Sequence, residues 1–161
     1  HKHVDAGSKA LAPFLTNLKG AGADFGAGWG WLSEQALVSP DITALSLIEA
    51  DYYALEAAKK NVSDPRAEFA WMDVTALTKQ AGPFDFVISN PPFHQTRKAE
   101  PDLGKDFIGA AARVLKPSGR FLMVANRQLP YESSLDHFFK KWTSLFQDNQ
   151  FKVFEAVKPR K

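Results

Sequence analysis

The sequence contains no cysteine, and this absence removes several kinds of chemistry. Without a thiol the chain cannot form a disulfide, bind a metal through thiolates, ligate an iron–sulfur cluster or use a cysteine nucleophile. The absence also fits the reducing cytoplasm, where disulfides are rare. Histidine is scarce too: His1 and His3 lie at the chain end, and His94 and His137 are isolated. We therefore expect no metal site.

Long apolar runs and a strong net charge are also missing. No stretch approaches the roughly 20 consecutive apolar residues that a membrane-spanning helix needs, so we expect a soluble, cytoplasmic protein. Lysine and arginine total 20 against 18 aspartate and glutamate, which gives a net charge of only +2. Affinity for a nucleic acid must then come from local patches rather than from the overall field. The length of 161 residues fits one domain.

What the sequence does contain is a glycine-rich stretch, Ala-Asp-Phe-Gly-Ala-Gly-Trp-Gly, at residues 23–30. It reads as the end of a strand that runs into a loop, and residues 31–37 open a helix directly afterwards. Glycine lets the backbone take positive φ and lets a ligand approach closely, while the free N–H groups of the helix start face the loop. The pattern predicts a nucleotide-cofactor cradle, formed by Asp24, Gly26, Ala27, Gly28 and Gly30.

The glycine spacing bears on the identity of the cofactor. A dinucleotide fingerprint has its third glycine five residues after the first. That position is Trp31 here, and the third glycine falls at Gly30, so the spacing disfavours NAD. The Asp-x-Gly-x-Gly-x-Gly loop resembles instead the first motif of the class I S-adenosylmethionine-dependent methyltransferases. The alternative is a glycine-rich turn that binds no ligand.

Two acidic residues follow the next two predicted strands. Glu49 ends an apolar run, where its carboxylate can accept hydrogen bonds from both hydroxyls of a ribose, with Ala50 beside it. A surface carboxylate is the alternative. Asp73, followed by Val74, ends another short strand. Its carboxylate can accept from an adenine amine or cap a helix that begins at Thr75, and both uses are physically reasonable.

The fourth predicted strand, residues 84–89, breaks abruptly into Asn90-Pro91-Pro92-Phe93. Two prolines exclude helix and sheet, so the chain makes a stiff bend at the strand's carboxyl end, where open α/β sheets bind ligands. The Asn90 oxygen and backbone carbonyls can accept both hydrogens of an exocyclic amine while Phe93 stacks on the ring. We expect these four residues to be catalytic. The alternative is a structural proline turn followed by a core phenylalanine.

Alternating helix and strand patterns predict an α/β fold with a mostly parallel sheet, helices on both faces and an antiparallel last strand. A hairpin turn at residues 147–150 accounts for the antiparallel strand. Helices are expected from Asp5 to about Lys19 and at residues 31–37, 52–61, 102–115 and 134–141. Strands are expected at residues 42–48, 67–71, 84–89, 120–125, 142–146 and 151–157.

The motifs together carry a narrower resemblance. They are the glycine loop, the stretch Ser89-Asn90-Pro91-Pro92-Phe93-His94-Gln95, the later segments Val124-Ala125-Asn126 and Leu129-Pro130-Tyr131, the leading Asp5-Ala6-Gly7-Ser8 and the final Phe151-Lys152-Val153. With these the chain resembles the catalytic half of the bacterial ribosomal RNA guanine-N2 methyltransferases. Within that family it is similar to the type C enzymes, which act on RNA of the small subunit, and to the type G enzymes, which act on RNA of the large one.

The resemblance implies a Rossmann-like seven-stranded sheet, S-adenosyl-L-methionine as methyl donor, and ribosomal RNA or a ribosomal subunit as partner. It also implies cofactor contacts from Gly26, Gly28, Glu49, Asp73 and Asn90. Because such enzymes carry a second, degenerate domain ahead of the catalytic one, residues 1–161 are expected to be a single methyltransferase domain, the C-terminal half of a longer protein. Ala27 stands where many relatives have cysteine, a change that leaves the backbone cradle intact.

The expected reaction is direct transfer of the methyl group to the exocyclic N2 amine of a guanine. Asn90 would orient the amine and stabilise the charge that grows on it, and the product can lose its proton to water, so no catalytic base is required. Two alternatives stay open. The chain could methylate adenine N6 or a protein glutamine, since the Asn-Pro-Pro motif suits any planar amine, or it could be a catalytically silent domain that only binds RNA.

Overall fold

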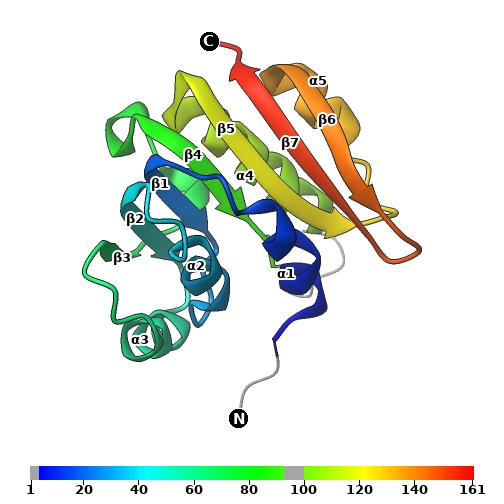
Figure 1. Cartoon of the computed structure of the whole chain (residues 1–161). Coiled ribbons are helices and arrows are strands. Elements are labelled where there is room, and N and C mark those ends of the chain that lie inside the picture. Colours follow the sequence, from blue (N-terminus) through cyan, green and yellow to red (C-terminus); the bar gives the residue numbers. More distant parts are fainter. Residues whose placement is uncertain (1–3, 93–99) are drawn as a thin grey trace.

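A computed structural model describes residues 4–92 and 100–161 of the chain. These residues form a seven-stranded sheet in the order β3-β2-β1-β4-β5-β7-β6 (Figure 1). The strands are β1 (Gly20–Phe25), β2 (Ile42–Glu49), β3 (Ala67–Trp71), β4 (Phe84–Ser89), β5 (Leu115–Asn126), β6 (Phe139–Gln147) and β7 (Phe151–Pro159). The helices are α1 (Ala6–Leu11), α2 (Trp31–Ala36), α3 (Tyr52–Asn61), α4 (Glu100–Val114) and α5 (Glu132–Phe138), with 3-10 turns at Ala12–Phe14, Val74–Ala76 and Lys79–Ala81.

Five adjacent strands pair in parallel, and only the last strand of the chain runs in the opposite direction to the other six. β3, β2, β1, β4 and β5 pair in parallel, whereas β7 runs antiparallel to both β5 and β6, between which it is inserted. The predicted fold class is confirmed. The parallel arrangement brings the carboxyl ends of β1, β2 and β4 to the same edge of the sheet, which positions the loops that follow them.

Hydrophobic side chains fill a separate cluster on each face of the sheet. Successive strand residues point to opposite faces, so Phe86 and Ile88 pack with residues of α1, α2 and α3, while Val87 packs with residues of α4 and α5. Figure 1 shows α1 and α2 in front of the sheet and α4 behind it. The prediction of helices on both faces is therefore confirmed.

Two predicted helices are shorter than expected. The first ends at Leu11 and continues only as a 3-10 turn, because Pro13 has no N–H to extend the hydrogen-bond ladder. The predicted helix at residues 134–141 ends at Phe138. Phe139 instead begins β6, where it pairs with Pro159 and its ring stacks on Phe121 with centroids 5.9 Å apart. Tertiary pairing overrides the local helical pattern there.

The fifth strand is longer than predicted. It begins at Leu115, so residues 116–119, which lie between the predicted helix and the predicted strand, fall within its range. Its pairing with β4 is irregular at that point, because Phe84 pairs with Leu115 and Phe86 pairs with Arg120. The additional residues of β5 are thus accommodated as a bulge in its pairing with β4. None of the helices in residues 4–92 and 100–161 has the length and apolar character needed to cross a membrane.

Candidate cofactor and acceptor site

A pocket of about 380 Å³ lies where the loops after β1, β2 and β4 meet. Its walls come from the glycine loop, the junction of β2 and α3, the proline bend after β4 and the first turn of α1. The structure brings most of the predicted site residues into this lining, namely Asp24, Gly26, Ala27, Gly28, Gly30, Glu49, Asn90, Pro91 and Pro92. Phe93 lies outside the described residues, and its role stays a prediction.

The glycine loop has the backbone that the sequence predicts. Gly28 has a φ of 57° and Gly30 a φ of 99°, values that residues with a side chain rarely adopt. A Cβ on Gly28 would meet nothing within 4 Å, so this position is open toward the pocket, whereas a Cβ on Gly30 would come within 2.7 Å of Val62. Gly28 therefore leaves room for a ligand, and Gly30 allows the loop to pack on α3.

Glu49 links the end of β2 to two neighbouring loops. Its Oε1 accepts a hydrogen bond of 2.7 Å from the backbone N–H of Gly28, and its Oε2 accepts one of 2.9 Å from Asp51 N–H. Each carboxylate oxygen can accept a further hydrogen bond. Because Glu49 also lines the pocket, its carboxylate can hold the glycine loop and still accept from the hydroxyl groups of a bound ribose.

Asp24 lies beneath the glycine loop and is almost completely buried. The pKa of its carboxyl group is raised from 3.8 to about 7, chiefly by burial and also by the nearby charge of Glu49, while a hydrogen bond from Ser33 acts in the opposite direction. Ser33 Oγ donates that hydrogen bond over 2.7 Å from the first turn of α2. The contact joins β1 to α2 across the loop. Because the carboxyl group titrates near neutral pH, a cation bound in the pocket would shift it toward the ionised form.

Asn90 is held by the first turn of α1. Its side-chain Nδ2 donates to the carboxylate Oδ2 of Asp5 and, over 3.0 Å, to Ser8 Oγ. Immediately before it, Ser89 Oγ donates over 2.9 Å to the backbone carbonyl of Phe25, which ties the end of β4 to the end of β1. The predicted acceptor loop therefore lies directly beside the predicted cofactor loop.

Three predicted cofactor residues lie outside the pocket lining. The backbone carbonyl of Ala50 accepts a hydrogen bond of 2.9 Å from Trp71 Nε1. The carboxylate of Asp73 accepts from Thr75 N–H and Thr75 Oγ1, so the predicted helix-cap use is present. Val74 has its side chain in the hydrophobic core. The adenine contact proposed for Asp73 and the contacts of Ala50 and Val74 stay predictions.

Several residues line the pocket without having been predicted to do so. Asp5 and Asp51 have the sequence pattern of helix caps alone, and Ser8 has no pattern that marks it. Two tryptophans flank Gly30 in the sequence, Trp29 and Trp31, and bulky side chains at these positions could have indicated that the loop lines a pocket. The other unpredicted lining residues are Leu32 and Ala54.

The charge of the lining is one-sided. Asp5, Asp24, Glu49 and Asp51 contribute carboxyl groups, and the described residues of the lining include no lysine or arginine. Such a pocket favours a ligand that carries positive charge and disfavours the pyrophosphate of a dinucleotide. The electrostatics therefore agree with the glycine spacing in disfavouring NAD.

Known proteins of similar sequence support a narrower assignment. Ribosomal RNA small subunit methyltransferase C of Shewanella denitrificans is 31% identical over 157 residues, which are 98% of this chain and 46% of that protein. The protein of the same name from Photobacterium profundum is 32% identical over 160 residues, 98% of this chain and 47% of its own length. The chain thus spans less than half the length of these curated relatives.

A solved structure and a family model agree with these relatives. The 16S rRNA N2 methyltransferase of T. thermophilus, solved in complex with AdoMet and guanosine, has a TM-score of 0.79 and 27% sequence identity, covering 97% of this chain and 44% of that chain. The family model described as Methyltransferase small domain matches residues 1–155. The chain therefore belongs to the methyltransferase small domain family, and its sheet is that of a class I methyltransferase.

Proposed function

We propose that this chain transfers a methyl group from S-adenosylmethionine to the exocyclic N2 amine of a guanine in ribosomal RNA. The observation that carries the proposal is that Asn90, Pro91 and Pro92 line the same pocket as the glycine loop and Glu49. A cofactor cradle thus adjoins a group that can accept from an amine. The relatives named as ribosomal RNA methyltransferases and the T. thermophilus enzyme with AdoMet and guanosine support the choice of donor and acceptor.

The pocket residues fit this cofactor in shape and in charge. Gly28 offers open space where a side chain would otherwise project, and Glu49 offers carboxylate oxygens for ribose hydroxyls. S-adenosylmethionine carries a sulfonium and an ammonium group against one carboxylate, and this net positive charge matches a lining with carboxyl groups and no described basic side chain. The glycine loop and Glu49 would hold the nucleoside, and the carboxyl groups would favour the charged end.

In the proposed reaction the cofactor supplies a methyl group bonded to a positively charged sulfur, which leaves as a neutral thioether. Asn90 Oδ1 would accept a hydrogen bond from the guanine amine and favour a pyramidal nitrogen, whose lone pair forms the new N–C bond. The backbone carbonyl of Pro91 would accept a hydrogen bond from the second amine hydrogen. An amide is not a base at neutral pH, so the proton of the methylated amine passes to water.

The direct test identifies the methylated group. The chain, and a longer protein that contains it, would be incubated with labelled S-adenosylmethionine and undermethylated ribosomal subunits or free ribosomal RNA, and the RNA then digested to nucleosides. We expect label in N2-methylguanosine. Label in N6-methyladenosine or in protein glutamine would overturn the acceptor assignment, and an absence of label with every substrate would favour a silent RNA-binding domain.

The acceptor site is tested by Asn90→Ala. Loss of one preorganised polar partner slows an enzyme by about 10²–10³-fold, so single-turnover transfer at saturating cofactor should fall by that factor. The variant should stay folded, as thermal melting would show, and its cofactor affinity should change little. A wild-type rate would mean that the proline bend is only structural and that the acceptor site must be sought around Asn126 and Tyr131.

A further inference from the structure

The first turn of α1 touches the acceptor loop from more than 80 residues away in the sequence, since Asp5 and Ser8 both accept hydrogen bonds from Asn90. We propose that Asp5, Gly7 and Ser8 are positioning residues that fix the side-chain amide of Asn90 with its oxygen toward the acceptor amine. The proposal rests on the proposed function, because it assigns these residues a role in the orientation of the group that accepts from the substrate.

The chemistry of Asp5 decides which way the amide faces. A carboxylate can only accept hydrogen bonds, so the amide atom beside Asp5 Oδ2 has to be the nitrogen. Ser8 Oγ, 3.0 Å from Nδ2, takes the second amide hydrogen. In the opposite orientation the amide oxygen would face a carboxylate oxygen, which is repulsive. Both amide hydrogens therefore form hydrogen bonds with the first turn of α1, and Oδ1 is the amide atom that is available to accept from the substrate.

The same contact strengthens Asn90 as an acceptor. Hydrogen bonds in a chain polarise one another, and an amide whose N–H groups donate to a carboxylate carries more negative charge on its oxygen. That oxygen would meet the positive charge that grows on the amine during transfer. Asp5 thus acts on the reaction through Asn90, and the charge of its carboxylate contributes as well as its position.

Gly7 leaves the space that this arrangement needs. A Cβ at position 7 would lie 3.0 Å from Asp5 Oδ2 and 3.3 Å from both Nδ2 and Oδ1 of Asn90. These distances are shorter than ordinary contacts, so the Asn90 amide or the Asp5 carboxylate would have to shift by a few tenths of an ångström. Glycine is otherwise a poor choice inside a helix, because alanine favours the helical backbone more. The benefit of Gly7 therefore lies in the contact with Asn90.

Ser8→Ala tests the proposal with little effect on the helix. Asp5 caps α1 by accepting from the backbone N–H of Ser8, a bond that does not use the Ser8 side chain. The variant therefore loses the amide partner and keeps the cap. We expect single-turnover methyl transfer at saturating cofactor to slow by about tenfold, with unchanged affinity for S-adenosylmethionine. Ser39→Ala, which loses a 2.7 Å hydrogen bond to the Leu18 carbonyl away from the pocket, is the matched control and should keep the wild-type rate.

Gly7→Ala gives a readout that a merely structural role would not produce. The added methyl group should leave the melting temperature unchanged or raise it, while transfer slows by about tenfold or more because the amide is displaced. Asp5→Ala loses both the cap and the amide partner and should be the slowest of these variants. Asp5→Asn keeps a capping oxygen and a neutral acceptor, so it should recover part of the rate.

The outcomes separate this inference from the proposed function. If Asn90→Ala is slow while Ser8→Ala, Gly7→Ala and Asp5→Ala all transfer at the wild-type rate, the acceptor site stands and the positioning role is wrong. If these variants lose affinity for the cofactor and keep the rate at saturation, the α1 residues contact the cofactor instead, and the proposal is also overturned. If Asn90→Ala itself transfers at the wild-type rate, the proposed acceptor site fails first.

Discussion

The carboxylate of Glu49 accepts a 2.7 Å hydrogen bond from the backbone N–H of Gly28 and so joins the end of β2 to the glycine loop. A second bond, from Asp51 N–H to the other carboxylate oxygen, fixes the start of α3. The side chain proposed to bind the ribose is thus already held by the two loops on either side of it. Preorganisation of this kind lowers the entropy that ligand binding must offset.

Glu49→Ala should weaken binding of S-adenosylmethionine by about 1.5–3 kcal/mol, through loss of a charge-assisted contact to the ribose and loss of the anchor for the loop. Glu49→Gln keeps the shape of the side chain and one accepting oxygen, and should lose less. Titration calorimetry on the two variants and the wild type provides the measurement. Tighter binding of NAD than of S-adenosylmethionine by the wild type would contradict both the glycine spacing and the charge of the lining.

Asp24 should make the stability of the chain depend on pH near neutrality. Burial raises the pKa of its carboxyl group to about 7, so the folded chain holds a proton that the unfolded chain has already released. The stability contributed by the protonated group is therefore fully present below pH 3.8 and is lost as the pH rises through about 7. The charge of Glu49 acts in the same direction, and the hydrogen bond from Ser33 acts against it.

Asp24→Asn removes this dependence, because the amide stays neutral and can still accept from Ser33. We expect the unfolding free energy of the variant to rise relative to the wild type by about 2–3 kcal/mol between pH 5 and pH 8, measured by urea denaturation. Asp102→Asn, at an exposed position, controls for the removal of one carboxylate. An equal difference at both pH values would mean that Asp24 is ionised in the folded chain throughout this range.

Much of the fold could be predicted because its local signals are strong. The strands at residues 67–71 and 84–89 and the helix at residues 52–61 have the predicted bounds. The alternation of apolar strands with capped helices is enough to indicate a mostly parallel sheet, and the order of parallel strands then brings their carboxyl ends together. The early end of the first helix has a local cause, Pro13, whereas the error at Phe139 has a distant one. Phe139 becomes a strand residue because it pairs with Pro159 and stacks on Phe121.

The same distinction applies to the site. Glycines followed by a helix, and a carboxylate at a strand end, are local patterns with a physical meaning, so the cofactor loop could be predicted. The contact of Asn90 with Asp5 and Ser8 joins residues 85 and 82 positions apart. No local pattern encodes such a contact. In the sequence, Asp5 has only the pattern of a residue that caps the helix after it. The first turn of α1 meets the acceptor loop only in the tertiary structure.

Lys152 should stabilise the segment that follows β5. Its side chain is 5% exposed, and its Nζ donates to the backbone carbonyl of Leu129 and lies 2.9 Å from Glu132 Oε2. Lys152→Met leaves the carbonyl and the carboxylate without this partner and should lower the unfolding free energy by about 1–3 kcal/mol. Glu132→Gln should cost less than about 1 kcal/mol, because that side chain is 43% exposed and glutamine keeps an oxygen that can accept from Lys152. Urea denaturation of the two variants tests this, and equal losses would show that the ion pair, not the buried donor, provides the stability.

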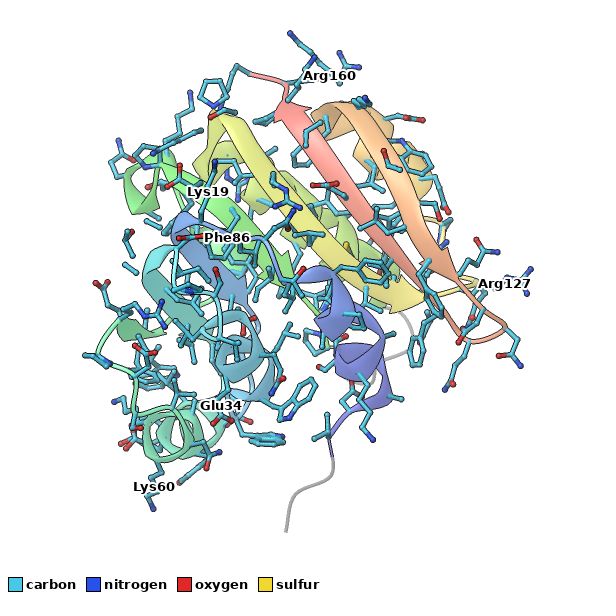
Figure 2. The ribbon with its side chains drawn as sticks, viewed as in Figure 1. Lys19, Glu34, Lys60, Phe86, Arg127 and Arg160 are labelled. Carbon is cyan, nitrogen blue, oxygen red and sulfur yellow. The ribbon has the colours of Figure 1, made fainter. Side chains whose placement is uncertain are left out.

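The distribution of basic side chains predicts weak binding of RNA by this chain. The net charge is only +2. Figure 2 shows the labelled basic residues Lys19, Lys60, Arg127 and Arg160 well apart from one another. Affinity for a polyanion depends on how many phosphates are neutralised together, since each neutralised phosphate releases counterions. Scattered cations cannot neutralise a continuous run of phosphates.

We therefore expect this chain to bind S-adenosylmethionine normally and to bind ribosomal RNA weakly, with a shallow dependence of affinity on salt. The whole Shewanella denitrificans relative, of which the matching region is 46%, provides the comparison and should bind the same RNA more tightly and with a steeper salt dependence. Affinities for both proteins would be measured at several salt concentrations, alongside single-turnover methylation of the same RNA. Equal affinity, slope and rate would contradict this expectation, because they would show that the residues of this chain are sufficient to hold the RNA as tightly as the longer relative does.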